Sequence, residues 1–140
     1  NAKHYVKEVI KGPAFETFFA QKDKGLFPIA VLNNEYINLI KAETQYITLS
    51  DETLLKQKAK HPELTMDDYQ KLPDIIENAE LVIQDGNLTL VFIKKDGKIY
   101  HAAIKATKTG KGLFLTSFRM TNAEDVIRAK GKGKILKDVF

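Results

Sequence analysis

The chain of 140 residues carries 22 Lys and Arg against 18 Asp and Glu, and its 44% apolar content is typical of a soluble globular protein. It contains no cysteine, which excludes disulfides and thiolate metal sites. No apolar run reaches the length of a membrane span, and no secretory apolar segment begins the chain. Because it starts at Asn1 without an initiator Met, we expect it to be a piece of a longer polypeptide.

The first 49 residues indicate helices with two short strands. Residues 14–20 place three phenylalanines at helical spacing, and Leu26–Leu32 predicts a strand that Pro28 confines to a sheet edge. An asparagine at 33 or 34 can cap the next helix. The β-branched segment Tyr46–Leu49 predicts a second short strand.

Two capped helices are expected next. Ser50 predicts a helix start, and the helix should end near residue 60, since Pro62 disfavours helical geometry in the residue before it. Thr65 and Asp68 form a pattern like a capping box for a second helix. We expect Pro73 to interrupt that second helix.

The second half of the chain predicts a run of strands. Turn sequences separate four alternating segments: Leu81–Gln84, Leu88–Lys94, Lys98–Thr107 and Leu113–Met120. A helix over Ala123–Lys130 and a flexible basic loop over residues 131–134 should follow. Helices first and strands afterwards predict an α+β fold. Without a repeat or a long linker, residues 1–140 should form a single domain.

The hairpin formed by Lys98–Thr107 and Leu113–Thr121 gathers polar side chains on one face. Tight pairing sets Lys105 opposite Leu115, Ala103 opposite Ser117 and His101 opposite Arg119. One face then carries the polar quartet His101, Lys105, Ser117 and Arg119. The apolar face carries Tyr100, Ala102, Ile104, Ala106, Phe114, Thr116, Phe118 and Met120.

The preceding turn, Asp96-Gly97, sets the neighbouring strand. A two-residue loop would pair Phe92 with His101 and would place Leu88, Leu90 and Phe92 beside the polar quartet. A slip of one residue would reverse this placement.

Positive charge is concentrated at the C-terminal end. Residues 106–140 hold eight Lys or Arg against three Asp or Glu, whereas the first 105 residues are nearly balanced. This asymmetry suits a polyanionic partner, most simply nucleic acid, and the alternative is a solvated basic tail.

The residue types favour phosphodiester chemistry without a metal. Histidines 4, 61 and 101 lack metal-ligand spacing, and the chain has no phosphate-binding glycine loop or nucleophile elbow. Metal-independent RNA cleavage needs a proton-transfer group, which histidine supplies, and cations that hold the phosphate. Each candidate also has an ordinary role: His61 can end a helix, and Arg119 can pair with an acidic helix.

Several segments, in order and spacing, resemble a phage-associated nuclease-toxin family of the superfamily that unites barnase, EndoU, tRNA-cutting colicins and RelE. They are Ser50–Leu54, Lys58–Leu64, Asp68–Pro73, Tyr100–Thr107 and Leu113–Arg119. The resemblance covers residues 46–121, leaving residues 1–45 as a variable N-terminal part and residues 122–140 as a basic helix and tail.

The resemblance implies N-terminal helices packed on a twisted antiparallel sheet. It also implies a metal-independent endoribonuclease without cofactor, which cuts tRNA to a 2′,3′-cyclic phosphate. By motif position the catalytic residues would be His61, Lys105, Ser117 and Arg119. The residues near the substrate would be Lys58, Tyr69, His101, Thr107 and Thr121. Either His61 or His101 would exchange protons.

The same resemblance implies a toxin of interbacterial competition, as in contact-dependent growth inhibition. We expect a C-terminal part of a larger secreted or cell-surface protein, which acts in the target-cell cytoplasm as a free monomer and is neutralised by a cognate immunity protein. The alternative is a non-enzymatic RNA- or partner-binding module of a phage or secreted carrier.

Overall fold

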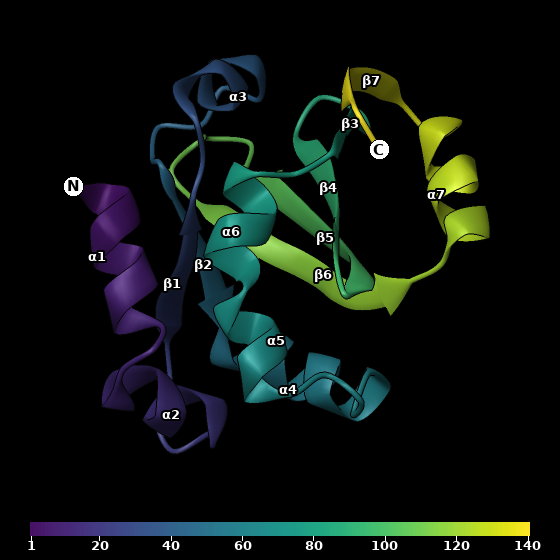
Figure 1. The fold of residues 1–140 in the computed structure, drawn as a ribbon. Helices are drawn as coiled ribbons and strands as arrows, with labels where there is room; N and C mark the ends of the chain where they lie inside the picture. Colours follow the sequence, from purple (N-terminus) through teal and green to yellow (C-terminus); the bar gives the residue numbers. More distant parts are fainter.

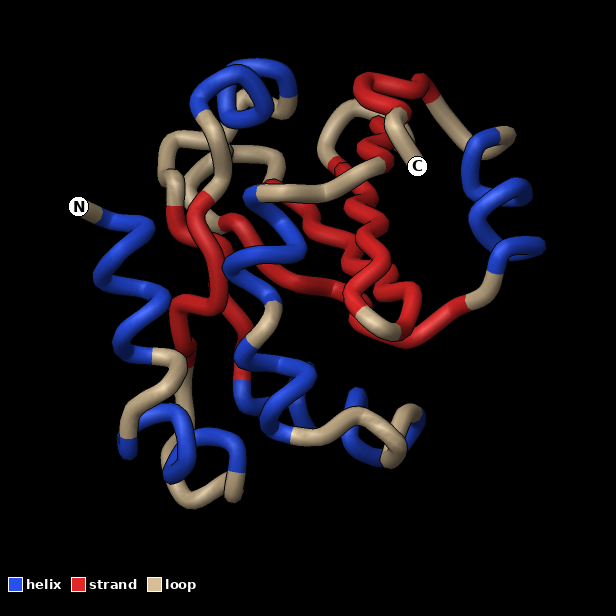
Figure 2. The backbone as a smooth tube through the Cα atoms, viewed as in Figure 1, coloured by secondary structure: helices blue, strands red, loops and turns tan.

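The computed structural model describes residues 1–140 as a seven-stranded sheet with seven helices (Figures 1 and 2). The helices are α1 (Ala2–Val9), α2 (Pro13–Phe19), α3 (Asn34–Leu39), α4 (Asp51–Lys60), α5 (Met66–Gln70), α6 (Leu72–Glu77) and α7 (Ala123–Lys130). The strands are β1 (Leu26–Val31), β2 (Tyr46–Ser50), β3 (Leu81–Gln84), β4 (Thr89–Asp96), β5 (Lys98–Ala106), β6 (Leu113–Thr121) and β7 (Lys134–Asp138). The strand order is β1-β2-β6-β5-β4-β3-β7.

The sheet is mixed. The predicted α+β class is confirmed, but a wholly antiparallel sheet is wrong, because β2 and β6 run parallel with Thr48 beside Phe114. Parallel neighbours need a long crossover, and here the chain passes through α4–α6 and three strands between them. Every other neighbouring pair is antiparallel.

The predicted helix starts are confirmed. Ser50 accepts a hydrogen bond from the Thr53 backbone N–H, and Thr65 and Asp68 form a complete capping box. The expected interruption near Pro73 is present, at Lys71 between the end of α5 and the start of α6. Pro73 itself lies in the first turn of α6, where the missing backbone N–H has no intrahelical partner to lose.

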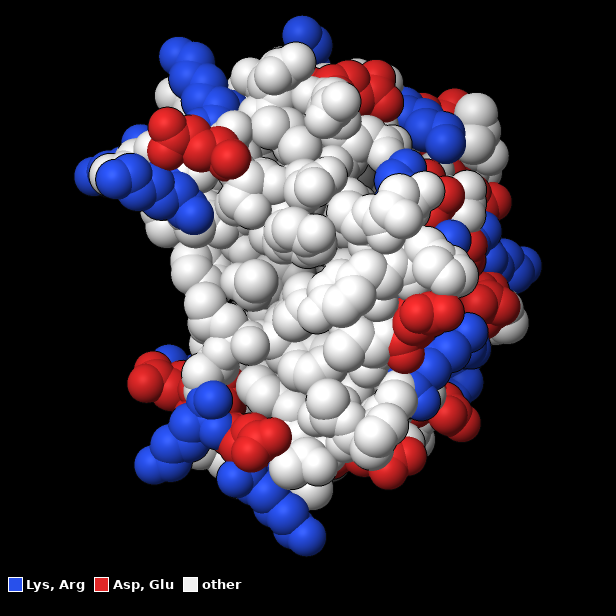
Figure 3. All heavy atoms as spheres, turned by 90° about the vertical axis from the view of Figure 1, so that its left-hand side faces the viewer, with Lys and Arg blue, Asp and Glu red and all other residues white.

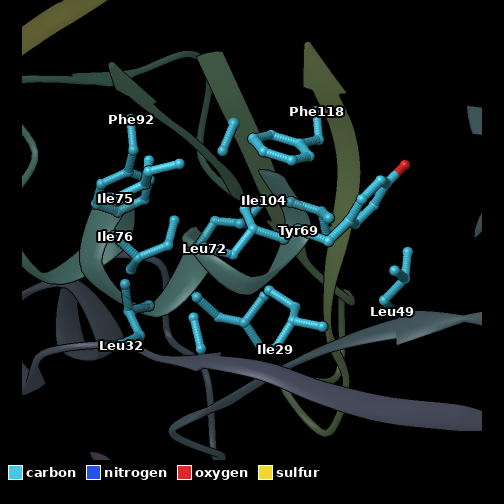
Figure 4. Close-up of a cluster of buried hydrophobic side chains, with 14 of the residues drawn as sticks. Ile29, Leu32, Leu49, Tyr69, Leu72, Ile75, Ile76, Phe92, Ile104 and Phe118 are labelled. Carbon is cyan, nitrogen blue, oxygen red and sulfur yellow. The ribbon is translucent and has the colours of Figure 1, made fainter. Parts of the chain in front are cut away.

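The two sheet faces are covered unequally. One face packs against most of the helices in a core that includes the fully buried Phe92, Ile104 and Phe118 (Figure 4). On the opposite face, Val126 and Ala129 of α7 pack against a smaller apolar cluster from β3, β4 and β5. We call this opposite side the α7 face; in Figure 1 its helix stands apart from the others.

The predicted register of β4 against β5 is wrong by one residue. Asp96 pairs with Lys98, so Gly97 alone turns the chain, with a φ of 73° that favours glycine. His101 therefore lies opposite Ile93 instead of Phe92. This shift sends Leu90 and Phe92 into the core and places Val91 and Ile93 on the α7 face.

A bulge in β6 also changes the hairpin. The register shifts between Ala103 and Ile104, which leaves Thr116 as an extra residue. The Thr116 hydroxyl donates to the Ala103 carbonyl at 3.1 Å. Lys105 consequently pairs with Phe114 instead of Leu115, and Phe114 and Thr116 leave the predicted apolar face.

The two edge strands of the sheet are β1 and β7. The edge position that Pro28 predicts for β1 is confirmed. Beyond Gly133, the predicted basic loop becomes β7 at Lys134, paired with β3. Gly133 lies so close to β3 that a Cβ there would collide with the Gln84 carbonyl oxygen.

Candidate functional site

The polar quartet lies on the α7 face, as its alternation predicts. His101 is directly opposite Arg119, and Ala103 is opposite Ser117. The β5 register is continuous, so Lys105 shares the face of His101. The predicted pairing near the Lys105 end is wrong because of the Thr116 bulge, but the common face survives it.

Three members of the quartet line one cavity between the sheet and α7. Its volume is about 280 Å³, near the lower end for ligand pockets. The lining residues include His101, Ser117 and Arg119 from the hairpin and Asp125 and Arg128 from α7. The others are Ile83, Asp85, Thr89, Val91, Ala103, Ala129 and Lys132. The cavity thus joins an imidazole, two hydroxyls, three cations and two carboxylates above an apolar base.

His101 is uncharged at neutral pH. Burial first, and then the positive charge of Arg119, lower the pKa of His101 from 6.5 to about 4, and Lys132 acts in the same direction. The Nδ1 atom is buried and has no hydrogen-bond partner. A neutral imidazole is the form that can accept a proton.

Arg119 is held by α7. Its Nη1 atom lies 3.3 Å from Oδ2 of Asp125 and 3.2 Å from the hydroxyl of Thr121. Thr121 in turn donates to Asp125 at 2.7 Å, and Arg128 pairs with the other oxygen of Asp125. The alternative role of Arg119 as the partner of an acidic helix is therefore realised. A guanidinium has five N–H donors, so donors remain for a bound anion.

Lys105 lies outside this cavity. It is exposed and, with Thr107, lines a neighbouring cavity on the α7 face. Lys105 lies four positions beyond His101 in β5, a backbone separation of about 13 Å. The Thr107 hydroxyl accepts a hydrogen bond from the Gly112 N–H at 3.0 Å, which fixes the loop after β5.

Two predicted site residues on or beside α4 are not brought to the quartet. His61 is the C-cap of α4, its Nδ1 lies 3.7 Å from Glu63, and it lines neither cavity. Its alternative helix-ending role is the one the structure shows. Lys58 donates to the Phe19 carbonyl at 2.7 Å and lies over the Phe19 ring, so its ammonium joins α4 to α2.

Tyr69 is part of the core. Its side chain is fully buried, and its ring packs against that of Phe19. Figure 4 shows Tyr69 near Phe118, whose ring it also contacts. Burial raises the pKa of Tyr69 to about 12. A fully buried side chain cannot contact RNA, so its predicted place near the substrate is wrong in this structure.

Sequence reasoning missed the contribution of α7. Asp125 lies in its first turn and Arg128 one turn later, and both reach the cavity. One sequence feature could have indicated it: Val126 and Ala129 are three positions apart among charged residues, a spacing that predicts one apolar face on the helix. That pattern does not say which sheet face the helix covers.

Charge is not spread evenly over the surface. Figure 3 views the molecule from the side of α1 and β1 and shows a broad area without charged residues, with charges gathered at its margins. Cations do line both cavities of the α7 face: Arg119, Arg128 and Lys132 in the first, Lys105 and Lys108 in the second. The α7 face therefore has more positively charged side chains at its cavities, where they could contact a phosphate, than the uncharged area shown in Figure 3.

No group of three or more His, Cys, Asp or Glu side chains is placed to hold a metal ion. None of the helices has the length and apolar character needed to cross a bilayer.

Comparisons of the chain with protein-family models, curated proteins and solved structures found no match.

Proposed function

We propose that this protein is a metal-independent endoribonuclease whose active centre is the cavity between β5, β6 and α7. The observation that carries the proposal is that a neutral histidine, His101, lies directly opposite Arg119 in a cavity that also contains Ser117. Cleavage of RNA without a metal needs a base for the 2′-hydroxyl proton and cations for the phosphate. This cavity supports both roles.

His101 is the proton-transfer group in this proposal, in place of His61. The imidazole takes the proton of the 2′-hydroxyl, and the 2′-oxygen attacks the adjacent phosphorus. The bond to the 5′-oxygen breaks, the protonated His101 gives its proton to that oxygen, and a 2′,3′-cyclic phosphate remains. Arg119 holds the phosphate through its remaining N–H donors, and Ser117 orients a phosphate oxygen.

The charge around His101 also favours this assignment. In the free protein, burial is the main cause that lowers the pKa of His101, and the charges of Arg119 and Lys132 add to it. A bound phosphate brings negative charge that opposes the two cations, so substrate binding should raise the pKa toward the range useful for proton transfer.

The test is incubation of the purified protein with total RNA in the presence of EDTA. Discrete new ends that carry 2′,3′-cyclic phosphates are the expected result. Arg119→Lys keeps the charge but loses the planar guanidinium, and should reduce cleavage at least tenfold. The matched control is Lys56→Arg on α4, an exposed site that lines neither cavity, and it should cut like the wild type. Intact RNA, or equal activity of the two variants, would contradict the proposal.

A second candidate function is RNA binding without cleavage. The observation that favours it is the ion pair of Arg119 with Asp125, because an arginine already paired need not serve a reaction. In that case the RNA stays intact and is retained on the protein in a salt-sensitive way.

The resemblance in the sequence extends the proposal to a substrate and a setting. We propose tRNA as the RNA, interbacterial competition as the role and a cognate immunity protein as the partner. Sequencing of RNA ends after induction of the protein in cells tests the substrate. Rescue of those cells by a small downstream reading frame tests the immunity partner.

A further inference from the structure

A second cavity adjoins the candidate site on the α7 face. It has a volume of about 390 Å³, and its lining includes Leu88, Lys105, Lys108, Phe114 and Thr116. Thr116 precedes Ser117 in β6, and Lys105 pairs with Thr89 in β4. Both Ser117 and Thr89 line the first cavity, so one strand of RNA can run from the first cavity into the second.

The aromatic ring in this second cavity is held in place by the backbone. The β6 bulge brings Phe114 opposite Lys105 and so onto the α7 face. A Cβ built on Gly112 would lie 2.5 Å from Cε2 of Phe114, so the ring packs against the bare backbone of Gly112. The Gly110 carbonyl accepts a hydrogen bond from the Glu43 N–H at 2.7 Å, which anchors this loop to the loop after α3. The ring is therefore a preformed platform.

The charges around the ring define the ligand. Lys105 and Lys108 are the charged residues of this lining, which contains no carboxylate. Both lysines are exposed, so their ammonium groups need no internal partner. An aromatic surface with two adjoining cations suits a flat, apolar group that carries phosphates, as in single-stranded nucleic acid.

Resting on the proposed function, we infer that this second cavity binds one unpaired RNA base, stacked on Phe114, further along the strand whose phosphate is cut in the first cavity. Lys105 and Lys108 hold the phosphates that flank this base. Lys105 is then a substrate-binding residue and does not touch the reacting phosphate. A strand separation of about 13 Å from His101 agrees with this division.

A single introduced fluorophore tests the stacking directly. The chain contains no tryptophan, so Phe114→Trp creates a lone reporter within the cavity. It is combined with His101→Gln to slow cleavage, and a short single-stranded RNA is titrated against it. Quenching by this RNA, and none by an abasic strand of equal length, is the expected result. The control is Tyr5→Trp in the same background, because Tyr5 is exposed on α1 and should report no quenching.

Affinity for the same RNA gives a second measurement. Phe114→Ala should weaken binding roughly 5- to 150-fold, the range for loss of one stacked base, while Phe114→Tyr should bind like the wild type. Gly112→Ala displaces the ring without removing it and should also weaken binding. If all three variants bind the RNA as tightly as the wild type does, the proposed base site is wrong. The proposed function still stands in that case if the wild type cuts RNA. If the tryptophan at position 114 responds to no RNA and the wild type cuts none, both the base site and the proposed ribonuclease function are wrong. A protein partner would then be the remaining candidate ligand of this cavity.

Discussion

The half-buried histidine of the candidate site should make the folded protein lose stability in weak acid. The pKa of His101 is about 4 in the folded chain, whereas an unfolded histidine titrates near 6.5. As the pH falls below 6.5, the unfolded chain binds a proton that the folded chain still refuses, so the free energy of unfolding decreases. The loss is about 2 kcal/mol at pH 5 and about 3 kcal/mol at pH 4, and it levels off below pH 4. Above pH 6.5 the contribution of His101 is constant.

Urea unfolding of the wild type and of His101→Gln, near pH 7.5 and near pH 5, measures this effect. Carboxylates also titrate in this range, but they are common to both proteins and cancel in the comparison. The wild type should lose about 2 kcal/mol more than His101→Gln between the two pH values. Equal losses would refute the assignment of a half-buried, neutral His101 beside Arg119. A matching NMR titration of His101 should show its ring uncharged at pH 6.

Three further substitutions test the fold. Gly133→Ala should detach β7 from β3 and lower the melting temperature, because its Cβ would meet the Gln84 carbonyl; an unchanged melting curve would argue against this pairing. Thr65→Ala removes the α5 cap and should cost about 1 kcal/mol in urea unfolding, and no loss would count against the capping box. Phe92→Ala should cost about 3–5 kcal/mol, far more than Phe140→Ala at an exposed site; similar costs would mean that β4 has the opposite register.

The parts of the fold that depend on neighbours in sequence could be predicted. Ser50 and Thr65 accept hydrogen bonds from residues three positions away, so their side-chain types already predict the helix starts. The hairpin of β5 and β6 places His101 opposite Arg119 because its alternation is regular in that half. Local chemistry was sufficient in each of these cases.

Other features depend on contacts that are distant in sequence or on one extra residue. A single residue at Gly97 decides which face Phe92 takes, and the sequence Asp-Gly allows more than one turn. The bulge at Thr116 depends on the Ala103 carbonyl across the hairpin. The strand β7 forms only because β3 offers it an unpaired edge.

The candidate site shows the same division. Alternation along one hairpin predicted that His101, Ser117 and Arg119 share a face, since that requires only a period of two. Motif resemblance placed His61 and Tyr69 near the site, but helix capping and core packing determine where they lie. The ion pair between Arg119 and Asp125, which holds α7 over the cavity, could not be predicted because it depends on how α7 packs on the sheet.

The most direct measurement of the central claim is the single-turnover rate at which His101→Gln cuts a defined RNA in EDTA, relative to the wild type. If the cavity between the sheet and α7 is the active centre, the rate should fall roughly 10²- to 10⁴-fold with the folded structure preserved. His61→Gln should cut like the wild type, because His61 lines neither cavity. Full activity of His101→Gln, with loss in His61→Gln, would mean that the active centre lies at the end of α4 and not in the cavity beside α7.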